Sequence, residues 1–524
     1  MRGFMVALEL GAFLVMSLLV AKCLLWLLST VRDVLLQLWA TRDMPGPPSY
    51  PLVGSFLAVA GPQEELYDKL VALRAEHGPT VKLWLGPVLV VIVSRPDDLE
   101  LVFTDARLAD KPWLMYASSM EPCLGAGLIT MNGEDYRRHR RLIAPSFAQN
   151  VLHSFAPSFN ANAHRLVDRL DELAESGEVF DASPLCRMCT SYTVCETVLS
   201  ADSSRLESDR QAVVRAVYQG VTLMFHRGIR PWYRFDTLFK LSRHYNDYQE
   251  MVRIANTFVS NVLDLKMRQK EEQEQEREVG RQGDDEDLGK AKPRAFLDHL
   301  LSSEEGQTLS KEELSGELKH LVAAANSTTS DTLSFFLYCV AIRQDIQDRI
   351  LEELDSVFEG DREREVTLAD LPQLKYLERV FKETLRLFAP APLYARQPSS
   401  DVKLPSGHTL PKGCVVLVSP HFTHRDPAVW ADPEDFDPDR FLPENSRGRH
   451  PHSFIPFSAG TRSCIGQRFV MMFLKTAAAT LLRRFHVRTA EDGPRRVCDI
   501  KPIFSLTLHV KGGTRIRVRR RAPA

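Results

Sequence analysis

The stretch Phe457-Ser-Ala-Gly460-Thr-Arg462-Ser-Cys464-Ile-Gly466 is the most informative in the chain, because residues of defined chemical use surround a single cysteine. Its two glycines allow tight backbone turns beside a flat ligand, its arginine can meet a carboxylate, and its phenylalanine can pack beside the sulfur. The run GQRFVMMFLKTAAATLL that follows predicts a helix whose first amides and dipole point at the sulfur and lower its pKa. The pattern therefore predicts that Cys464 binds a metal as a thiolate.

The composition is that of a large globular protein with no bulk affinity for nucleic acid. Of 524 residues, 44% are hydrophobic and 26% are charged, a balance that supports a sizeable core and excludes disorder throughout. The 66 basic and 68 acidic side chains give a net charge of -2, so no nucleic-acid partner is expected. The nine cysteines lack the spacing of a disulfide scaffold, and we expect them to be reduced.

The N-terminal segment is apolar enough to cross a membrane. From Leu10 to Leu28 it reads LGAFLVMSLLVAKCLLWLL, with Lys22 as its only charge, and this length spans a bilayer. The continuing leucine run favours a retained anchor over a cleaved signal peptide, with an amphipathic helix in the membrane interface as the alternative. We therefore expect an anchor at 1–30, a basic and proline-rich linker at 31–51 that acts as a semi-rigid spacer, and one large domain at 52–524.

The hydrophobic periodicity predicts a mainly α fold with small β-sheets. Helical patterns dominate residues 60–390, and strand-like runs are short, near 81–94, 415–419 and 504–510. No GxGxxG motif or P-loop occurs, so a nicotinamide or flavin must be carried by another protein. The charge-dense stretch 266–294 predicts a solvated helix end and a mobile loop. The basic C-terminal tail predicts a solvated segment, with contact to anionic membrane lipid as the alternative.

A long helix is predicted to start at Ser310 and to cross the whole body. Ser310 and Glu313 form a capping-box pattern, and a run to about residue 343 would be roughly 50 Å long. Its apolar middle contains the polar run Asn326-Ser-Thr-Thr-Ser330. Two interpretations stay open: hydroxyls bonded back to the carbonyls of the helix, or a functional site that uses them.

A second helix carries Glu383 and Arg386, which stand three residues apart and so share one face. Pairs at this spacing usually lie on solvated surfaces. The apolar residues around the pair, and the prolines at 390 and 392, instead indicate a helix that ends inside the protein. We therefore expect a buried ion pair.

These segments, in this order, resemble the cytochrome P450 family, and the resemblance extends from about Pro45 to Val510. It implies the fold of that family and a haem b whose iron is bound by Cys464. Glu383 and Arg386 match the family's ExxR pair, and Arg440 matches the arginine that completes a structural triad with them. The resemblance also implies a set of cofactor-binding residues, which are Tyr136, Arg140, Arg396, Phe457, Gly460, Arg462 and Gly466.

The segment IPFSAGTRSCIGQRF, with AFLDHLL at 295–301, is most similar to family four, the fatty-acid ω-hydroxylases and their insect relatives. This implies a monooxygenase that inserts one atom of O2 into a lipophilic substrate, a fatty acid or related lipid, with steroids and terpenoids left open. Electrons would come from NADPH through a membrane-bound reductase, with cytochrome b5 as a further partner. The implied location is the endoplasmic reticulum membrane, with the catalytic domain cytosolic. Candidate reductase contacts are Arg137, Arg138, Arg141 and Arg468.

The chain departs from the family-four pattern on the oxygen side. The pattern Glu-Gly-His-Asp-Thr-Thr aligns with residues 324–329, where Ala324 and Ser327 replace both acids. Loss of the first acid predicts non-covalent haem, and loss of the second leaves Thr328 and Ser327 as catalytic candidates without a carboxylate to relay protons. Tyr136 stands where the family has tryptophan, and its hydroxyl is expected to be able to reach a propionate. Three functions fit: a monooxygenase with a rewired proton path, a haem-thiolate isomerase or dehydratase of oxidised lipids, and a haem-binding protein with little catalysis.

Overall fold

The long helix predicted from Ser310 runs through the middle of the molecule. In the computed structural model it is α13 (Lys311–Ile342), and Ser310 and Glu313 form the predicted capping box, each side chain accepting the other residue's backbone N–H. Arg343 is the C-cap, so the predicted start and end are both confirmed. The structure describes residues 2–199, 207–234, 236–280, 296–303 and 306–522.

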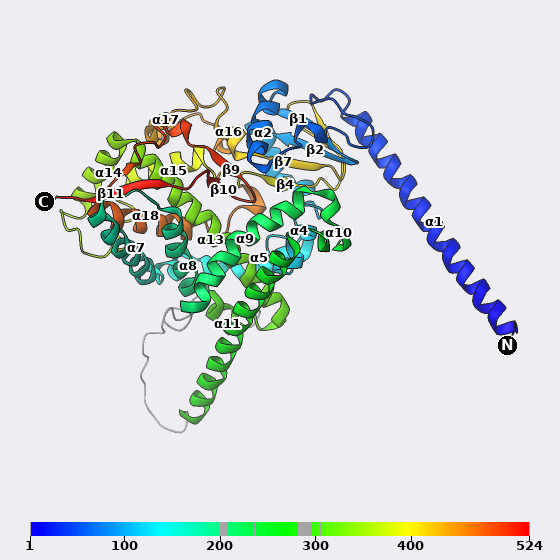
Figure 1. Ribbon diagram of the computed structural model, residues 1–524, viewed down its shortest axis with the longest axis horizontal. Helices are drawn as coiled ribbons and strands as arrows, with labels where there is room; N and C mark the ends of the chain where they lie inside the picture. The colour runs from blue at the N-terminus through cyan, green and yellow to red at the C-terminus, as the bar shows by residue number, and fades with distance from the viewer. Residues whose placement is uncertain (1, 200–206, 235, 281–295, 304–305, 523–524) are drawn as a thin grey trace.

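Other helices pack around α13 and leave most of it buried (Figure 1). Its C-terminal half lies in the largest apolar core, where Phe335 stacks on Phe388 and Phe336 stacks on Phe381, with ring centroids 4.5 and 4.1 Å apart. The helices that pack most extensively against α13 are α4 (Ala117–Leu124), α8 (Ser183–Val198), α9 (Glu207–Ile229), α11 (Tyr245–Gly280), α14 (Gln344–Val357), α15 (Lys375–Leu387) and α18 (Gln467–Arg484). Further helices include α2 (Gln63–His77), α3 (Pro96–Thr104), α5 (Gly133–Ile143), α6 (Gln149–His153), α7 (Ala156–Ser176), α10 (Asp236–Lys240), α12 (Phe296–Ser302), α16 (Pro420–His424) and α17 (Pro443–Ser446).

The β-structure of the described residues forms four small sheets, so the predicted mainly α fold is confirmed. In the largest sheet the order is β1-β2-β7-β4, with β2 antiparallel to β1 and parallel to β7. The run predicted as one strand at 504–510 is instead a hairpin, because Ser505 Oγ donates to the Thr507 carbonyl at 2.6 Å and turns the chain. The strands are β1 (Thr80–Leu85), β2 (Val88–Val93), β3 (Phe180–Asp181), β4 (Tyr394–Arg396), β5 (Val402–Lys403), β6 (Thr409–Leu410), β7 (Val415–Val418), β8 (Phe485–Thr489), β9 (Pro502–Phe504), β10 (Leu508–Val510) and β11 (Arg515–Arg520).

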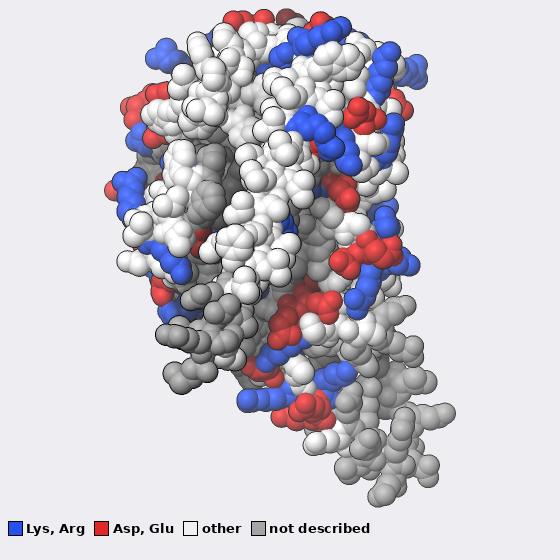
Figure 2. Space-filling model, turned by 90° about the vertical axis from the view of Figure 1, so that its right-hand side faces the viewer, with Lys and Arg blue, Asp and Glu red and all other residues white. Residues whose placement is uncertain are grey.

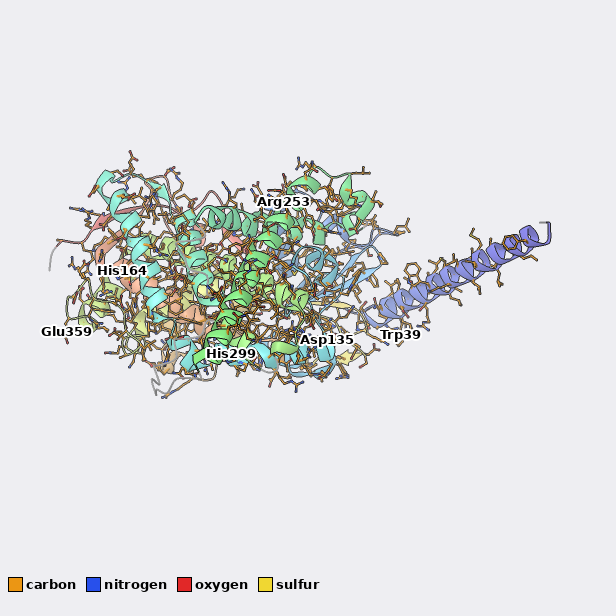
Figure 3. The ribbon with its side chains drawn as sticks, turned by 90° about the horizontal axis from the view of Figure 1, so that it is seen from below. Trp39, Asp135, His164, Arg253, His299 and Glu359 are labelled. Carbon is orange, nitrogen blue, oxygen red and sulfur yellow. The ribbon has the colours of Figure 1, made fainter. Side chains whose placement is uncertain are left out.

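The N-terminal helix α1 (Arg2–Ala40) projects away from the body (Figure 1). Its part from Leu10 to Ala40 has the length and hydropathy of a membrane span, and none of its most apolar window is buried in the protein. Trp39 lies at the base of the helix, where it meets the body (Figure 3). Seen from the side on which α1 projects, uncharged side chains form a continuous area, with charged groups around and below it (Figure 2). These features fit a membrane anchor.

The predicted linker is not a free spacer. The helix continues through residues 31–40, and Met44 beyond it is buried. The Pro45 carbonyl then accepts the backbone N–H of Lys82 in β1 at 2.8 Å. The proline-rich segment therefore packs against the body, because its carbonyls satisfy hydrogen-bond donors of an edge strand.

The basic C-terminal residues are not a solvated tail either. β11 pairs with β8 and β3, and its arginines meet acids of neighbouring segments, Arg515 with Asp492 at 2.5 Å and Arg520 with Asp171 at 2.6 Å. The prediction of a free tail is wrong, because the alternation of residues in this strand places its apolar side chains in the core, while Arg515, Arg519 and Arg520 stay exposed. The charge-dense stretch forms the end of α11 as far as residue 280, as predicted, and its remainder lies outside the described residues.

Candidate active site

The loop before Cys464 is held by backbone contacts. The Cys464 N–H donates to the Phe457 carbonyl at 2.9 Å, and Gly460 has a φ of 68°. A side chain at Gly460 would place its Cβ 2.0 Å from the Phe103 carbonyl oxygen, so only glycine fits there. Gly466 has no such requirement, since its φ is -89° and an added Cβ would make only an ordinary contact at 3.9 Å.

The sulfur of Cys464 experiences opposing electrostatic influences. α18 begins at Gln467, and the backbone amides of Gly466 and Gln467 hydrogen-bond to the sulfur, as the sequence predicts. Burial nevertheless outweighs these amides and the charge of Arg140, and it raises the pKa of the Cys464 thiol. The two amides thus act in the predicted direction, although burial leaves the pKa of the thiol above its usual value, and a bound iron would stabilise the thiolate.

Cys464 borders a cavity whose other wall includes α13. Thr328 and Thr332, one helical turn apart, contribute to that wall. Three further residues predicted from the sequence border the same cavity, namely Phe457, Arg396 and Arg462. The structure therefore brings the predicted ligand, a predicted catalytic hydroxyl and two predicted propionate-binding arginines to one space. Ser327 does not line this cavity.

Positive charge gathers beside this cavity, and among the described residues one long ion pair offsets it, Arg462 Nη2 to Asp110 Oδ1 at 3.6 Å. Arg396 is buried and donates to a backbone carbonyl at 2.9 Å and to Ser458 Oγ at 3.3 Å. Lys111 donates to a backbone carbonyl at 2.8 Å, and burial together with Arg396, Arg462 and Arg140 holds the pKa of Lys111 well below its usual value. In the described part of the chain neither Arg396 nor Lys111 has a carboxylate partner. The two propionates of a haem would neutralise such a cluster, so the residues present fit this cofactor.

Arg462 and Tyr136 form a stacked pair at the edge of the site. The Arg462 guanidinium carbon lies 3.4 Å from the centroid of the Tyr136 ring, and burial lowers the pKa of Arg462 to about 10. Arg462 also donates to two backbone carbonyls and to Asn132 Oδ1, each at 2.9 Å. The Tyr136 hydroxyl donates to the Thr461 carbonyl at 2.8 Å. Tyr136 therefore supports Arg462 with its ring, and its hydroxyl is engaged elsewhere than the sequence predicts.

The predicted triad lies behind the cysteine loop. Glu383 and Arg386 form a fully buried two-point ion pair at 2.7 and 2.8 Å, as expected, and Arg440 Nε lies 3.4 Å from Glu383 Oε1. Arg386 also donates to the His424 carbonyl at 2.8 Å. The His424 ring in turn accepts the Ile455 N–H at 2.8 Å. The triad thus fixes, through His424, the chain that leads into the cysteine loop.

Three hydroxyls of the polar run in α13, those of Ser327, Thr328 and Ser330, bond back to carbonyls of their own helix. Thr328 Oγ1 donates to the Ala324 carbonyl at 2.7 Å, and Ser327 Oγ donates to the Ala323 carbonyl at 3.1 Å. The helix stays α-helical through this run. Of the two interpretations that the sequence left open, the structure shows back-bonding, while Thr328 still borders the cavity.

The two buried acids of α13 are both paired with histidines. Glu317 Oε1 lies 2.7 Å from His139 Nδ1 of α5, and this contact raises the pKa of His139. Asp331 Oδ1 lies 2.9 Å from His509 Nδ1 of β10. Neither Glu317 nor Asp331 stands at an aligned position of the two missing acids, which are Ala324 and Ser327.

Sequence reasoning missed Lys111 and Thr332. Thr332 follows Thr328 by four residues, so the helical period could have found it. No sequence pattern marks Lys111, because it becomes part of the site only through the fold, which brings it near Arg396 and Arg462 from distant parts of the sequence.

Comparison with known proteins agrees with this geometry. A model of the cytochrome P450 family matches residues 44–514. The chain is 34% identical to cytochrome P450 4V2 of Mus musculus over 477 residues, which cover 90% of this chain and 89% of the relative. It is 34% identical to cytochrome P450 4V2 of Homo sapiens over 484 residues and 32% identical to cytochrome P450 4g15 of Drosophila melanogaster over 533 residues, with 91% of each chain covered in both comparisons. The chain therefore belongs to the cytochrome P450 family, as a haem-thiolate monooxygenase similar to family four.

Proposed function

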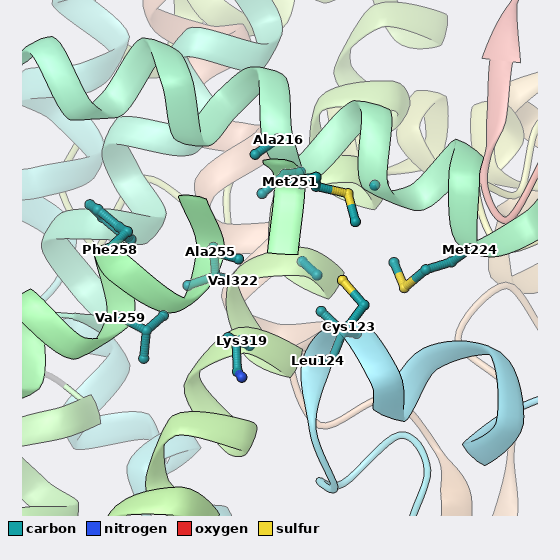
Figure 4. A pocket seen from close by; sticks show the side chains of 13 residues that line it. Cys123, Leu124, Ala216, Met224, Met251, Ala255, Phe258, Val259, Lys319 and Val322 are labelled. Carbon is teal, nitrogen blue, oxygen red and sulfur yellow. The ribbon is translucent and has the colours of Figure 1, made fainter. Parts of the chain in front are cut away.

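We propose that this protein hydroxylates a fatty acid or a related amphipathic lipid, with O2 and with electrons that a membrane-bound reductase delivers from NADPH. The observation that carries the proposal is that Cys464 and Thr328 border one cavity. A haem bound to Cys464 supplies the oxygen-activating chemistry. A second, mainly apolar cavity lined by residues of α4, α9, α11 and α13 (Figure 4) supports a lipid as the substrate.

Different side chains around the cavity would hold the cofactor and transfer protons. Arg396, Arg462 and Lys111 supply positive charge for the propionates, and Cys464 supplies the ligand. Thr328 Oγ1 donates a hydrogen bond to a helix carbonyl, and its lone pairs can still accept a hydrogen bond from a bound water. A water bound at Thr328 Oγ1 would relay protons in place of the missing carboxylate.

Electron supply is proposed at the surface on the cysteine side. A groove there is lined by Phe457 and the exposed Arg468, among others, and Arg137 and Arg141 are exposed on α5, where the two share one acid, Glu134. Exposed cations steer an acidic protein surface toward them, so we place the reductase here, with cytochrome b5 as a second donor. α1 would hold the single catalytic domain on the cytosolic side of the endoplasmic reticulum membrane.

The test is turnover of the purified, haem-loaded protein with NADPH, reductase, dodecanoic acid and isotopically labelled O2. The proposal predicts a hydroxylated acid that carries one labelled oxygen atom, and NADPH consumption that depends on the fatty acid. Conversion of a lipid hydroperoxide without NADPH, in place of hydroxylation, would favour the isomerase or dehydratase. Haem binding with no product from any lipid would favour a binding protein, and either result contradicts the proposal.

A further inference from the structure

Two histidines and an acid meet at the surface between α3 and the short turn Pro451–Ser453. Glu100 lies on α3, His450 caps the turn, and His452 lies within it. One ring nitrogen of each histidine and a carboxylate oxygen of Glu100 all lie within 4.8 Å of one another. Glu100 is exposed and both histidines are partly exposed, so an ion can reach the three groups from solvent.

His450 presents one nitrogen to the acids of α3. Its Nε2 lies 3.2 Å from Glu100 Oε2 and 3.6 Å from Asp97 Oδ1, and the two acids, three residues apart, share one face of the helix. Its Nδ1 accepts the backbone N–H of His452 at 3.2 Å. Binding a metal through Nε2 would move the proton of the ring to Nδ1 and break this long hydrogen bond, which is a small cost beside a new metal–nitrogen bond.

The second imidazole, His452, is held in place by an aromatic contact. Its ring stacks on that of Phe103 at the end of α3, with centroids 5.8 Å apart and an angle of 19° between the planes. Among the described residues the Nδ1 atom of His452 is buried and has no hydrogen-bond partner. An ion pair between Glu100 and His450 accounts for two of the three groups and leaves this ring nitrogen unexplained.

The donor set selects the kind of ion. Imidazole nitrogens suit Zn²⁺ and its neighbours among the transition metals, whereas Mg²⁺ and Ca²⁺ prefer sites made of oxygen alone. Zinc binds histidine nitrogen and carboxylate oxygen at about 2.1 Å in a tetrahedron, so two such ligand atoms stand roughly 3.4 Å apart. The ligand atoms of Glu100, His450 and His452 lie close enough to reach this spacing by small rotations of their side chains.

The cluster joins two segments that both support the cysteine loop. On one side, the Phe103 carbonyl lies so close to Gly460 that no side chain fits at that position. On the other side, the turn that holds His452 leads within a few residues to Phe457, whose carbonyl accepts the Cys464 N–H at 2.9 Å. An ion bound between α3 and the turn would therefore restrain both supports of the loop.

We propose that Glu100, His450 and His452 bind a zinc ion, with water as the fourth ligand, and that this zinc holds α3 against the segment that leads into the cysteine loop. Asp97 lies one helical turn from Glu100 and adds negative charge beside the ion. The inference does not depend on the substrate or on the reaction.

The test titrates zinc into the haem-loaded full chain, prepared without an affinity tag, in competition with a chromophoric zinc chelator. Wild type should bind one zinc ion at its tightest site, and an excess of Mg²⁺ should not displace it. His452→Phe keeps a flat ring over Phe103 and should weaken zinc binding about tenfold or more, since even the loss of a residue that only supports a ligand typically costs that much. Glu100→Gln should weaken it as well.

The matched control is His244→Phe. His244 is also partly exposed and stacks on a ring, that of His226, with centroids 5.3 Å apart, but it lies outside the cluster. This variant should bind zinc as wild type does. A wild-type affinity for zinc no higher than that of His452→Phe would overturn the site.

Transfer of haem to an acceptor protein gives a second reading. Zinc should slow the transfer from wild type and from His244→Phe, because it restrains the cysteine loop, and it should leave the rate for His452→Phe unchanged. A transfer rate that zinc does not change in wild type would overturn the proposed support of the loop.

Discussion

The Thr328 hydroxyl of α13 donates a hydrogen bond of 2.7 Å to the Ala324 carbonyl one turn earlier. In the family-four pattern the positions four residues and one residue before this threonine hold acids, and here they hold Ala324 and Ser327. A hydroxyl engaged in this way can relay a proton only by releasing the carbonyl or by accepting from water. The cysteine side provides iron binding, whereas α13 must support oxygen activation. The two properties are therefore separable in this chain.

Restoring the acid should raise turnover. Ser327→Asp places a carboxylate next to Thr328, and because a positioned proton-transfer group typically contributes about 10² or more in rate, we expect faster product formation and less NADPH consumed without product. The measurement is product formed per NADPH oxidised in the presence of reductase. Ser327→Asn, which has the same shape without the acid, should behave like wild type. Equal turnover and coupling in Ser327→Asp would show that the missing acid does not limit the enzyme.

The haem should be non-covalent. Ala324 offers no carboxylate to form an ester with the haem, so acid denaturation followed by reverse-phase chromatography should release unmodified haem from the protein. Ala324→Glu restores the carboxylate, and a fraction of its haem should elute with the polypeptide after turnover. Haem that stays attached to wild-type protein would contradict this prediction.

Breaking the buried ion pair between Glu383 and Arg386 should lower both the stability of the protein and its haem content. Glu383→Gln leaves the Arg386 charge uncompensated in a fully buried position, which typically costs about 3–5 kcal/mol. Denaturant unfolding and the ratio of haem to protein should both report the loss. The control is Glu250→Gln, in an exposed pair with Arg253 at the same spacing, which should cost less than about 1 kcal/mol. Similar effects in the two variants would contradict the structural role of the triad.

The His139–Glu317 contact should make stability depend on pH. The hydrogen bond to Glu317 raises the pKa of His139 above its ordinary value of 6.5, so its contribution to stability is fully present below about pH 6.5. That contribution is lost as pH rises through the raised pKa. The free energy of unfolding of wild type should therefore fall as pH rises above about 6.5, relative to that of Glu317→Gln. Parallel profiles for the two proteins would contradict the pairing.

Local patterns predicted the parts of the molecule whose neighbours are close in sequence. The capping box at Ser310, the buried pair of Glu383 and Arg386, and the amides behind Cys464 follow from spacing within single helices. Features made by distant segments were not predictable in this way. Lys111 gains its role from two arginines on other elements, and the basic C-terminal tail becomes a strand because a partner strand is available. The raised pKa of Cys464 likewise depends on burial, which no local pattern reports.

The account depends most on Cys464 as the ligand of the haem iron. The direct test is the reduced carbon-monoxide difference spectrum of wild type, Cys464→Ala and, as a matched control, Cys498→Ala at another free cysteine. Wild type and Cys498→Ala should show the absorption band of a thiolate-ligated haem, and Cys464→Ala should lose it. Wild-type protein that takes up no haem, or a Cys464→Ala variant with the same spectrum as wild type, would contradict the account.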